Sequence, residues 1–315
     1  MDLLGNLAQQ RGYFLRREAL GLGCDDKTLH RGVRSGALVR IRQGAYSPTP
    51  TWRAMDEQAR FLARSLAAYE LSRDEVHLSH TSALAAYGCP LWRVRFDRVH
   101  LTYRGSGTTR VEAGVTHHTP GTIEVGEYVE RNGIGLASPA LATIGGLSLM
   151  GLESCLIAGD WMLHEKLTDA QTLWDLKTRL ERHPKTRHLE VALRMLDGRS
   201  ASPGESRARF LFWRMGVPCP DLQHDVVDEN GLLIGTTDFA WPDHNTYGEF
   251  DGRLKYGRLL KSGQTAGDAV FAEKQREDAI RRATGGTVVR WTWDDLTADS
   301  APSRQLLSIL RRRAA

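Results

Sequence analysis

The sequence predicts a multidomain protein of the α+β or α/β type in which three regions fold in succession. Two breaks in the pattern carry this prediction, because both are rich in Pro, Ser, Thr and Gly: Ser47-Pro48-Thr49-Pro50-Thr51 and Gly198-Arg199-Ser200-Ala201-Ser202-Pro203-Gly204. A chain of 315 residues is long enough for two or three separate cores. We therefore expect domains over residues 1–51, 52–198 and 199–315.

Charge is distributed unevenly along the chain. A hydrophobic content of 41% and a charged content of 25% are ordinary for a soluble globular protein. From Arg11 to Arg42 the sequence holds eight Lys or Arg and three acids, a surplus of five that exceeds the whole-chain net charge of +4. The basic character is therefore concentrated near the N-terminus.

Cysteine spacing and the start of the chain predict a cytoplasmic protein. Four cysteines lie far apart and form no CxxC pair, so neither a cysteine zinc site nor a disulfide framework is indicated. The first residues, MDLLGNLAQQRG, lack the layout of a signal peptide. Residues 133–152 carry no charge, but Ser138-Pro139 within them is typical of an N-cap and helix start. We expect a buried helix there and no membrane span.

The first region has the layout of a winged helix-turn-helix. Leu3, Leu4 and Leu7 predict a first amphipathic helix, and residues 16–20 predict a short second one. Asp25 or Asp26 can cap a third helix. Leu29 and Val33 lie four residues apart and would face inward from it. Residues 38–46 alternate in the manner of a β-wing.

The outward positions of this region are cationic. On the third helix and on the wing, where we expect Arg40 and Arg42 on one side, they are Lys27, His30, Arg31, Arg34, Arg40 and Arg42. A cationic helix followed by a cationic ribbon suits a DNA major groove and its flanking phosphates. The alternative is a solvated basic face on a small interaction module. We favour binding to double-stranded DNA because both elements place their charge outward.

The same region resembles the N-terminal domain of AbiEi-type antitoxins, which are transcriptional repressors of toxin–antitoxin operons. The resemblance rests on residues 13–20 (YFLRREAL), 29–36 (LHRGVRSG) and 39–46 (VRIRQGAY), and residues 78–88 (LSHTSALAAYG) look like the continuation in that family. It implies operator-type DNA binding in which the third helix reads the base sequence. It also implies a cognate toxin or defence partner.

The middle region is predicted to mix strands and helices. Residues 97–103 and 114–119 have strand patterns, and residues 149–181 are largely helical in pattern. Four histidines draw attention to a metal site: His80, His100, His117 and His118. No carboxylate or cysteine accompanies them at ligand spacing, so we interpret them as structural or surface histidines. The expected role of this region is that of a scaffold.

The third region contains four acids in a regular setting. Ser202-Pro203-Gly204-Glu205 opens a helix, whose apolar side we expect to be Phe210, Leu211, Trp213 and Met215. Strands are predicted over residues 222–227, 232–241 and 246–251, with Asn230-Gly231 as a type I′ turn.

A symmetric hairpin explains why these acids should meet. If its centre lies between Asp243 and His244, Asp238 stands opposite Glu249, with Cβ atoms roughly 5 Å apart. Asp251 then shares the face of Glu249. Such a cluster needs a cation, and oxygen ligands indicate Mg²⁺ or Mn²⁺. The alternative is that the strands are amphipathic and the acids face water, but their other residues are strongly apolar.

This region resembles the PD-(D/E)XK nuclease superfamily, in the branch of the very short patch repair endonucleases. The resemblance spans residues 202–296 and rests on DFAWP at 238–242, EFDG at 249–252 and VVRWTW at 288–293. It implies a restriction-endonuclease-like domain with a mixed central sheet. Glu205, Asp238 and Glu249 would be its metal ligands.

The match departs from the superfamily pattern at one position. Asp251 stands where a lysine is expected, and Lys255 or Lys274 would have to supply the positive charge. A metal-bound water of lowered pKa would then attack a phosphodiester. The leading hypothesis is a Mg²⁺-dependent DNA endonuclease that serves phage defence or a toxin–antitoxin-like module. The alternative is an AbiEi-like repressor whose nuclease-like domain is inactive, and a mismatch-repair nuclease is a weaker third.

Overall fold

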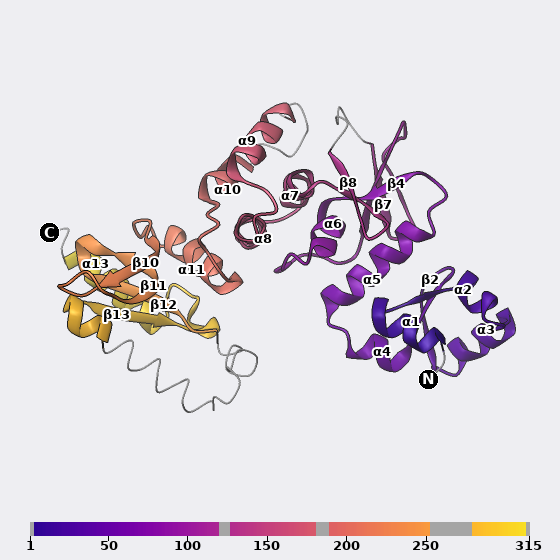
Figure 1. The fold of residues 1–315 in the computed structure, drawn as a ribbon, viewed down its shortest axis with the longest axis horizontal. Coiled ribbons are helices and arrows are strands. Elements are labelled where there is room, and N and C mark those ends of the chain that lie inside the picture. Colours follow the sequence, from indigo (N-terminus) through magenta and orange to yellow (C-terminus); the bar gives the residue numbers. More distant parts are fainter. Residues whose placement is uncertain (1–2, 120–126, 181–188, 253–278, 313–315) are drawn as a thin grey trace. The chain divides into compact units, whose positions relative to one another are not determined.

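The structure is a computed structural model that describes residues 3–119, 127–180, 189–252 and 279–312 (Figure 1). The chain divides into two compact units. Unit 1 comprises Met1–Ala158 and Lys166–Arg194, and unit 2 comprises Gly159–Glu165 and Met195–Ala315. This division into two compact units does not test the three expected domains, so the boundaries at residues 51 and 198 stay predictions.

Unit 1 begins with a small helical and stranded module, residues 3–48, which we call the N-terminal module. Its elements are α1 (Leu3–Arg11), β1 (Phe14–Leu15), α2 (Arg16–Gly21), α3 (Asp26–Arg34), β2 (Leu38–Arg42) and β3 (Ala45–Pro48). The strands form an antiparallel sheet in the order β1-β3-β2. Leu29 of α3 is 2% exposed and packs with Phe14 and Tyr46, as the periodicity of the third helix predicts.

The segment predicted as a linker after this module is regular structure. Ser47 and Pro48 complete β3, and α4 (Thr49–Ala54) begins at once. A proline in the first turn of a helix lacks only an N–H that has no partner there, so Pro50 starts α4 instead of breaking it. The linker interpretation of residues 47–51 is therefore wrong.

The rest of unit 1 surrounds a mixed sheet, which agrees with the predicted mixture of helices and strands. The sheet has the order β6-β7-β5-β4-β9-β8, and its β4–β9 and β5–β7 pairs are parallel. Its strands are β4 (Val76–Leu78), β5 (Val99–Tyr103), β6 (Arg110–Glu112), β7 (Val115–His118), β8 (Tyr128–Arg131) and β9 (Ile134–Ala137). The helices are α5 (Glu57–Glu70), α6 (His80–Tyr87), α7 (Pro139–Leu147), α8 (Leu152–His164), α9 (Ala170–Arg179) and α10 (Leu189–Met195), of which α8 and α10 end in unit 2.

The uncharged segment at residues 133–152 holds β9 and the buried helix α7, whose N-cap Ser138 accepts a hydrogen bond from the Leu141 amide at 3.3 Å. In the part of the chain that the structure describes, no helix is both long enough and apolar enough to cross a membrane.

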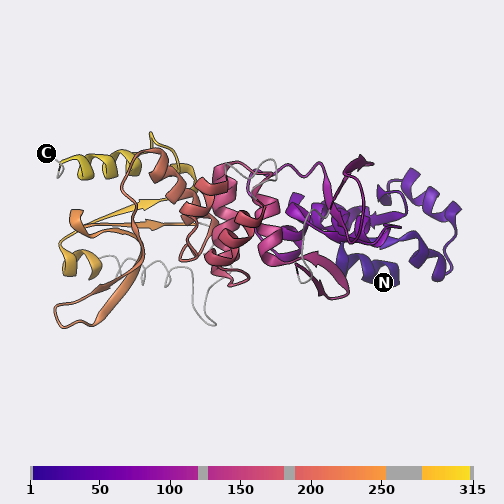
Figure 2. The same ribbon diagram turned by 90° about the horizontal axis from the view of Figure 1, so that it is seen from above.

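Unit 2 has a four-stranded mixed sheet with helices packed on it. The strand order is β10-β11-β12-β13, antiparallel except for the parallel β12–β13 pair. Its elements are α11 (Pro203–Arg214), β10 (Asp221–Val227), β11 (Leu233–Trp241), η1 (Pro242–His244), β12 (Thr246–Phe250), β13 (Thr287–Trp291), η3 (Trp293–Asp295) and α13 (Ala301–Arg312). Figure 2 shows the β10–β11 hairpin in orange and α13 in yellow.

The core of unit 2 is aromatic. Phe212 of α11 lies edge-on to Phe239, Trp241 and Trp291 of the sheet, with ring centroids 5.0–5.3 Å apart. Trp213, which the apolar pattern placed on the packed side of this helix, is instead 51% exposed. The helix turns Phe212 inward and leaves its neighbour in solvent.

The β10–β11 turn differs from the predicted type I′ form. That form needs positive φ at both central residues, whereas only Gly231 has it, at 79°. Asp228 accepts hydrogen bonds from the amides of Asn230 and Leu232, at 2.9 and 2.8 Å, and so closes a longer loop. The side chain of Asp228 therefore determines the conformation of this turn.

Candidate nucleic-acid interface and acidic cluster

Helix α3 presents a cationic surface. Its N-cap is Asp25, whose carboxylate accepts a hydrogen bond from the Thr28 amide at 2.8 Å, which confirms one of the two predicted caps. The predicted outward residues of α3 are all exposed: Lys27, His30, Arg31 and Arg34. Because Leu29 fixes the opposite side in the core, these cations face solvent together.

The acid in the first turn of α3 is matched by an arginine from α2. The Arg16 guanidinium donates to both carboxylate oxygens of Asp26, at 2.6 and 2.5 Å. Both side chains are about half exposed, so we assign this pair a role in charge balance rather than in stability. The pairing offsets one of the two negative charges at the start of α3, where Asp25 is the other. The sequence did not suggest this pair because its members are ten residues apart.

The wing does not place its two arginines on one side. A β-bulge between Arg40 and Arg42 pairs Arg40 with Tyr46 and Arg42 with Ala45. Since Ala45 and Tyr46 are adjacent on β3, they face opposite sides of the sheet, and so do the arginines across from them. Arg40 is exposed, whereas Arg42 is half-buried and its burial lowers its pKa. The prediction of a single cationic side is wrong because the pattern could not reveal the extra residue.

A cleft of about 1060 Å³ lies within unit 1 beside the wing. The N-terminal module contributes Arg16, Asp26, His30, Arg40 and Arg42 to its lining, and later residues contribute Arg73, Asp74, Arg110 and Glu112. Arg110 is paired with Asp74 at 3.0 Å. Helix α3 contributes Asp26 and His30 to this lining, and its exposed residues Lys27, Arg31 and Arg34 lie outside it.

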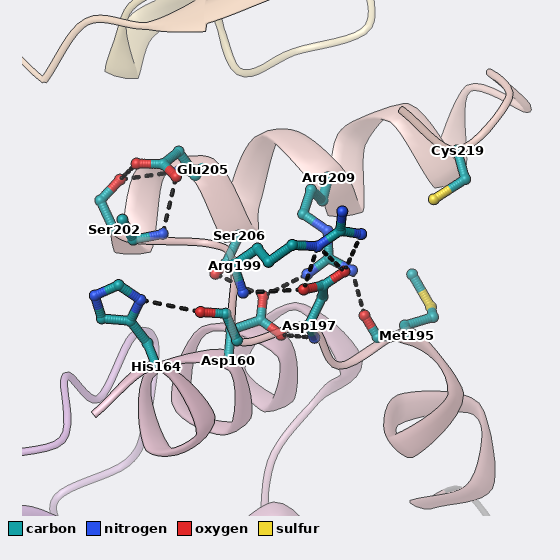
Figure 3. Close-up of polar contacts among 12 residues, drawn as sticks. Asp160, His164, Met195, Asp197, Arg199, Ser202, Glu205, Ser206, Arg209 and Cys219 are labelled. Carbon is teal, nitrogen blue, oxygen red and sulfur yellow. Dashed lines mark hydrogen bonds and ion pairs between the residues drawn. The ribbon is translucent and has the colours of Figure 1, made fainter. Parts of the chain in front are cut away.

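In unit 2, Glu205 is buried at the start of α11 (Figure 3). The Ser202 side chain caps the helix, and Glu205 accepts hydrogen bonds from the Ala201 amide at 2.9 Å and the Ser202 hydroxyl at 2.6 Å. The Gln223 amide of β10 donates to Glu205 at 3.1 Å and to Asp238 at 3.5 Å. Gln223 therefore links two of the predicted site residues. This amide side chain is not among the site residues predicted from the sequence, which are acids and lysines.

The predicted hairpin register is confirmed. Strands β11 and β12 pair Phe239 with Gly248, Ala240 with Tyr247 and Trp241 with Thr246. One further step along this register sets Asp238 opposite Glu249, and the Phe250 amide donates to Asp238 at 2.8 Å. The sequence-based pairing of the two acids follows from the turn alone.

A cation that the sequence argument missed lies against Glu249. Strand β13 pairs Arg290 with Glu249 in parallel register, and the guanidinium contacts the carboxylate at 2.8 Å. Glu249 is 5% exposed, so this is a largely buried ion pair. The carboxylate of Glu249 is thus already paired with a cation from the next strand.

The remaining predicted residues of the acidic site are Asp251, Lys255 and Lys274. Asp251 is half-buried, and its amide donates to the Trp291 carbonyl at 2.7 Å. Lys255 and Lys274 lie outside the described residues. Among the residues that are described, Glu205, Asp238 and Glu249 do not form a set of three ligands whose oxygens all lie within 4.8 Å, whereas three histidines of unit 1 do form such a set with their ring nitrogens.

Next to Glu205, Ser206 and Arg209 of α11 take part in a second buried polar network (Figure 3). Asp160 of α8 is 1% exposed and accepts hydrogen bonds from Arg209 at 2.6 Å, Ser206 at 2.8 Å and the Asp197 amide at 2.8 Å. Burial raises the pKa of Asp160 to about 6, against the lowering effect of Arg209. This network fixes the first two turns of α11, which position Glu205.

Comparison with known proteins assigns the N-terminal segment alone. A family model described as a transcriptional regulator, AbiEi antitoxin, matches residues 1–49. No curated protein matches the chain. The matched segment coincides with the N-terminal module, so the predicted AbiEi resemblance is confirmed for that part of the chain.

Proposed function

We propose that this protein is a DNA-binding transcriptional regulator of the AbiEi antitoxin type. The observation that carries the proposal is the agreement between the family match at residues 1–49 and the exposed cationic side of α3 within it. In this function the N-terminal module is a winged helix-turn-helix, α3 reads the major groove of the DNA, and Arg40 contacts the phosphate backbone of the DNA. A regulator of this kind would act with a cognate toxin as partner.

The test is the salt dependence of DNA binding by the full chain. A duplex selected from a random pool serves as target, and fluorescence anisotropy gives the affinity from about 50 to 200 mM salt. Each lost phosphate contact lowers the slope of log K against log salt by about 1, so Arg31→Ala with Arg34→Ala should lower it by about 2. Arg311→Ala, at an exposed arginine of α13, is the control. An unchanged slope and affinity in the double variant would refute α3 as the reader.

A second candidate function is metal-dependent cleavage of DNA by unit 2. The observation that favours it is the hairpin register, which sets Asp238 opposite Glu249 while Gln223 links Asp238 to Glu205. Carboxylate oxygens are the donors that Mg²⁺ prefers, and a bound Mg²⁺ would supply a water of lowered pKa. The Glu249–Arg290 pair counts against it, since one ligand is already engaged.

Cleavage is tested with supercoiled plasmid and Mg²⁺ or Mn²⁺. If unit 2 is a nuclease, the wild type nicks the plasmid, Asp238→Ala and Glu249→Ala abolish nicking, and Glu229→Ala in the exposed hairpin loop leaves it intact. No nicking by the wild type, or nicking that survives both substitutions, rejects this function. Neither result affects the proposed regulator, because that proposal depends on unit 1.

A further inference from the structure

Three histidines from separate elements of unit 1 converge on one point. His80 is the first residue of α6, His100 lies on β5 and His118 ends β7. One ring nitrogen from each lies within 4.8 Å of the other two. His100 Nδ1 and His118 Nε2 are 2.9 Å apart, and the rings of His80 and His118 stack at 4.0 Å.

The topology of the sheet explains this convergence. Strands β5 and β7 are parallel neighbours in which His118 stands opposite Thr102, two residues from His100 and therefore on its face. Strand β4 pairs with β5 and leads directly into α6, and the Ser79 amide donates to the His100 carbonyl at 3.1 Å. His117, the neighbour of His118, faces the other side of the sheet and lies beside Tyr103.

The surroundings hold the rings in place. The Ser79 hydroxyl contacts His80 Nδ1 at 3.0 Å, and the His100 amide donates to Ser82 at 2.9 Å. Gly145 of α7 leaves room for the His80 ring, since a Cβ there would lie 3.2 Å from its Cδ2 atom. His80 has a φ of +50°, a backbone conformation that side-chain-bearing residues rarely adopt and that recurs at binding sites.

We propose that His80, His100 and His118 form a binding site for a divalent transition metal such as Zn²⁺. Metal–nitrogen distances of about 2.0 Å in a tetrahedral site separate the ligand nitrogens by about 3.3 Å. That separation lies between the 2.9 Å of His100 and His118 and the 4.8 Å that bounds the group, so small ring rotations complete the site. When the ion binds, the ring that donates the hydrogen bond between His100 and His118 moves its proton, by exchange with solvent, to its other nitrogen, so that both neutral imidazoles offer a lone pair to the metal.

The chemistry of the site limits its occupant. Three imidazoles select borderline-soft ions such as Zn²⁺, Co²⁺, Ni²⁺ or Cu²⁺, in contrast to the oxygen donors of unit 2. Among the described residues no fourth His, Cys, Asp or Glu completes the group, so water or an added ligand takes the fourth position. The ion would tie the start of α6 to β5 and β7.

The first test is metal binding by the full chain, with any affinity tag removed and the protein stripped by a chelator. Zn²⁺ is titrated in competition with a chromophoric chelator, and Co²⁺ is added separately to record its visible absorption. We expect the wild type to bind one equivalent of Zn²⁺. The Zn²⁺ affinity should fall at least about 100-fold in His100→Gln and in His118→Gln, because each variant lacks one ligand and the loss of a partner outside the ligand set already costs about 10- to 100-fold. His117→Gln is the matched control and keeps the site.

The second measurement guards against misfolded variants. Tetrahedral nitrogen coordination gives wild-type Co²⁺ intense visible bands, and Zn²⁺ should raise the thermal midpoint of the wild type but not of the two ligand variants. An absence of these bands in the wild type overturns the proposal. So does Zn²⁺ binding that survives both substitutions, or that is lost equally in the His117→Gln control.

Discussion

The buried carboxylate of Asp160 gives the sharpest prediction about stability. It is 1% exposed, and its main partner Arg209 is 9% exposed, so water cannot replace either group when the other is removed. Asp160→Ala leaves the guanidinium buried with only the Met195 carbonyl and the neighbouring Asp197 charge. Removing one partner of a buried pair costs about 3–5 kcal/mol, and because Asp197 remains we expect about 3 kcal/mol.

The converse substitution should cost less, for a physical reason. In Arg209→Met the unpaired Asp160 can become neutral by binding a proton. An unpaired Arg209 has no such route, because a guanidinium does not lose its proton in proteins. Burial already raises the pKa of Asp160 to about 6, so protonation at pH 5 requires little free energy. Arg209→Met is therefore expected to be better tolerated at pH 5 than at pH 8.

Urea unfolding of the full chain, followed by circular dichroism and tryptophan fluorescence, measures these effects on the transition of unit 2. The double variant Asp160→Leu with Arg209→Met leaves no unpaired charge, so it should cost less than the sum of Asp160→Leu and Arg209→Met measured singly, by at least about 1 kcal/mol. Strict additivity, or a cost below about 1 kcal/mol for Asp160→Ala, would refute the reasoning that the pair is buried and coupled.

Two further predictions concern pH and packing. Burial, reinforced by Arg104, lowers the pKa of His77 to about 4, so the folded state holds a neutral ring that the unfolded chain protonates below about 6.5. The stability of unit 1 should fall as pH drops from about 6.5 to 4, and His77→Gln should flatten that dependence in urea unfolding at several pH values. Gly204→Ala would set a Cβ 1.8 Å from the Phe250 ring and should cost about 1–3 kcal/mol by the same measurement, whereas Gly21→Ala, with open space around it, should not destabilise.

The features that could be predicted from the sequence are those set by local chemistry. The N-caps Asp25, Ser138 and Ser202 each bond an amide three residues ahead, so the capping residue and its partner lie within a single turn. The register of β11 against β12 needed only the position of the turn between the two strands, because a hairpin with a known centre fixes which residues stand opposite each other.

The features that could not be predicted depend on one additional residue or one distant partner. The bulge in β2 inserts a residue that changes the side of Arg42, and alternation of residue types does not reveal it. Arg290 reaches Glu249 from a parallel strand 41 residues later, and the residue pattern of neither strand specifies that register. No short-range pattern carries that information.

The histidines of unit 1 show why spacing rules failed to find a candidate metal site. Such rules assume ligands that are neighbours on one helix or in one loop, as in paired cysteine motifs. Here His80, His100 and His118 are 18 to 38 residues apart and meet because β5 and β7 are parallel neighbours and β4 leads into α6. The adjacent pair His117 and His118 even misleads, since consecutive residues on a strand face opposite sides and only one can join the group. A search by sequence for nitrogen ligands would therefore need the sheet order first, and the sheet order is what the sequence alone does not supply.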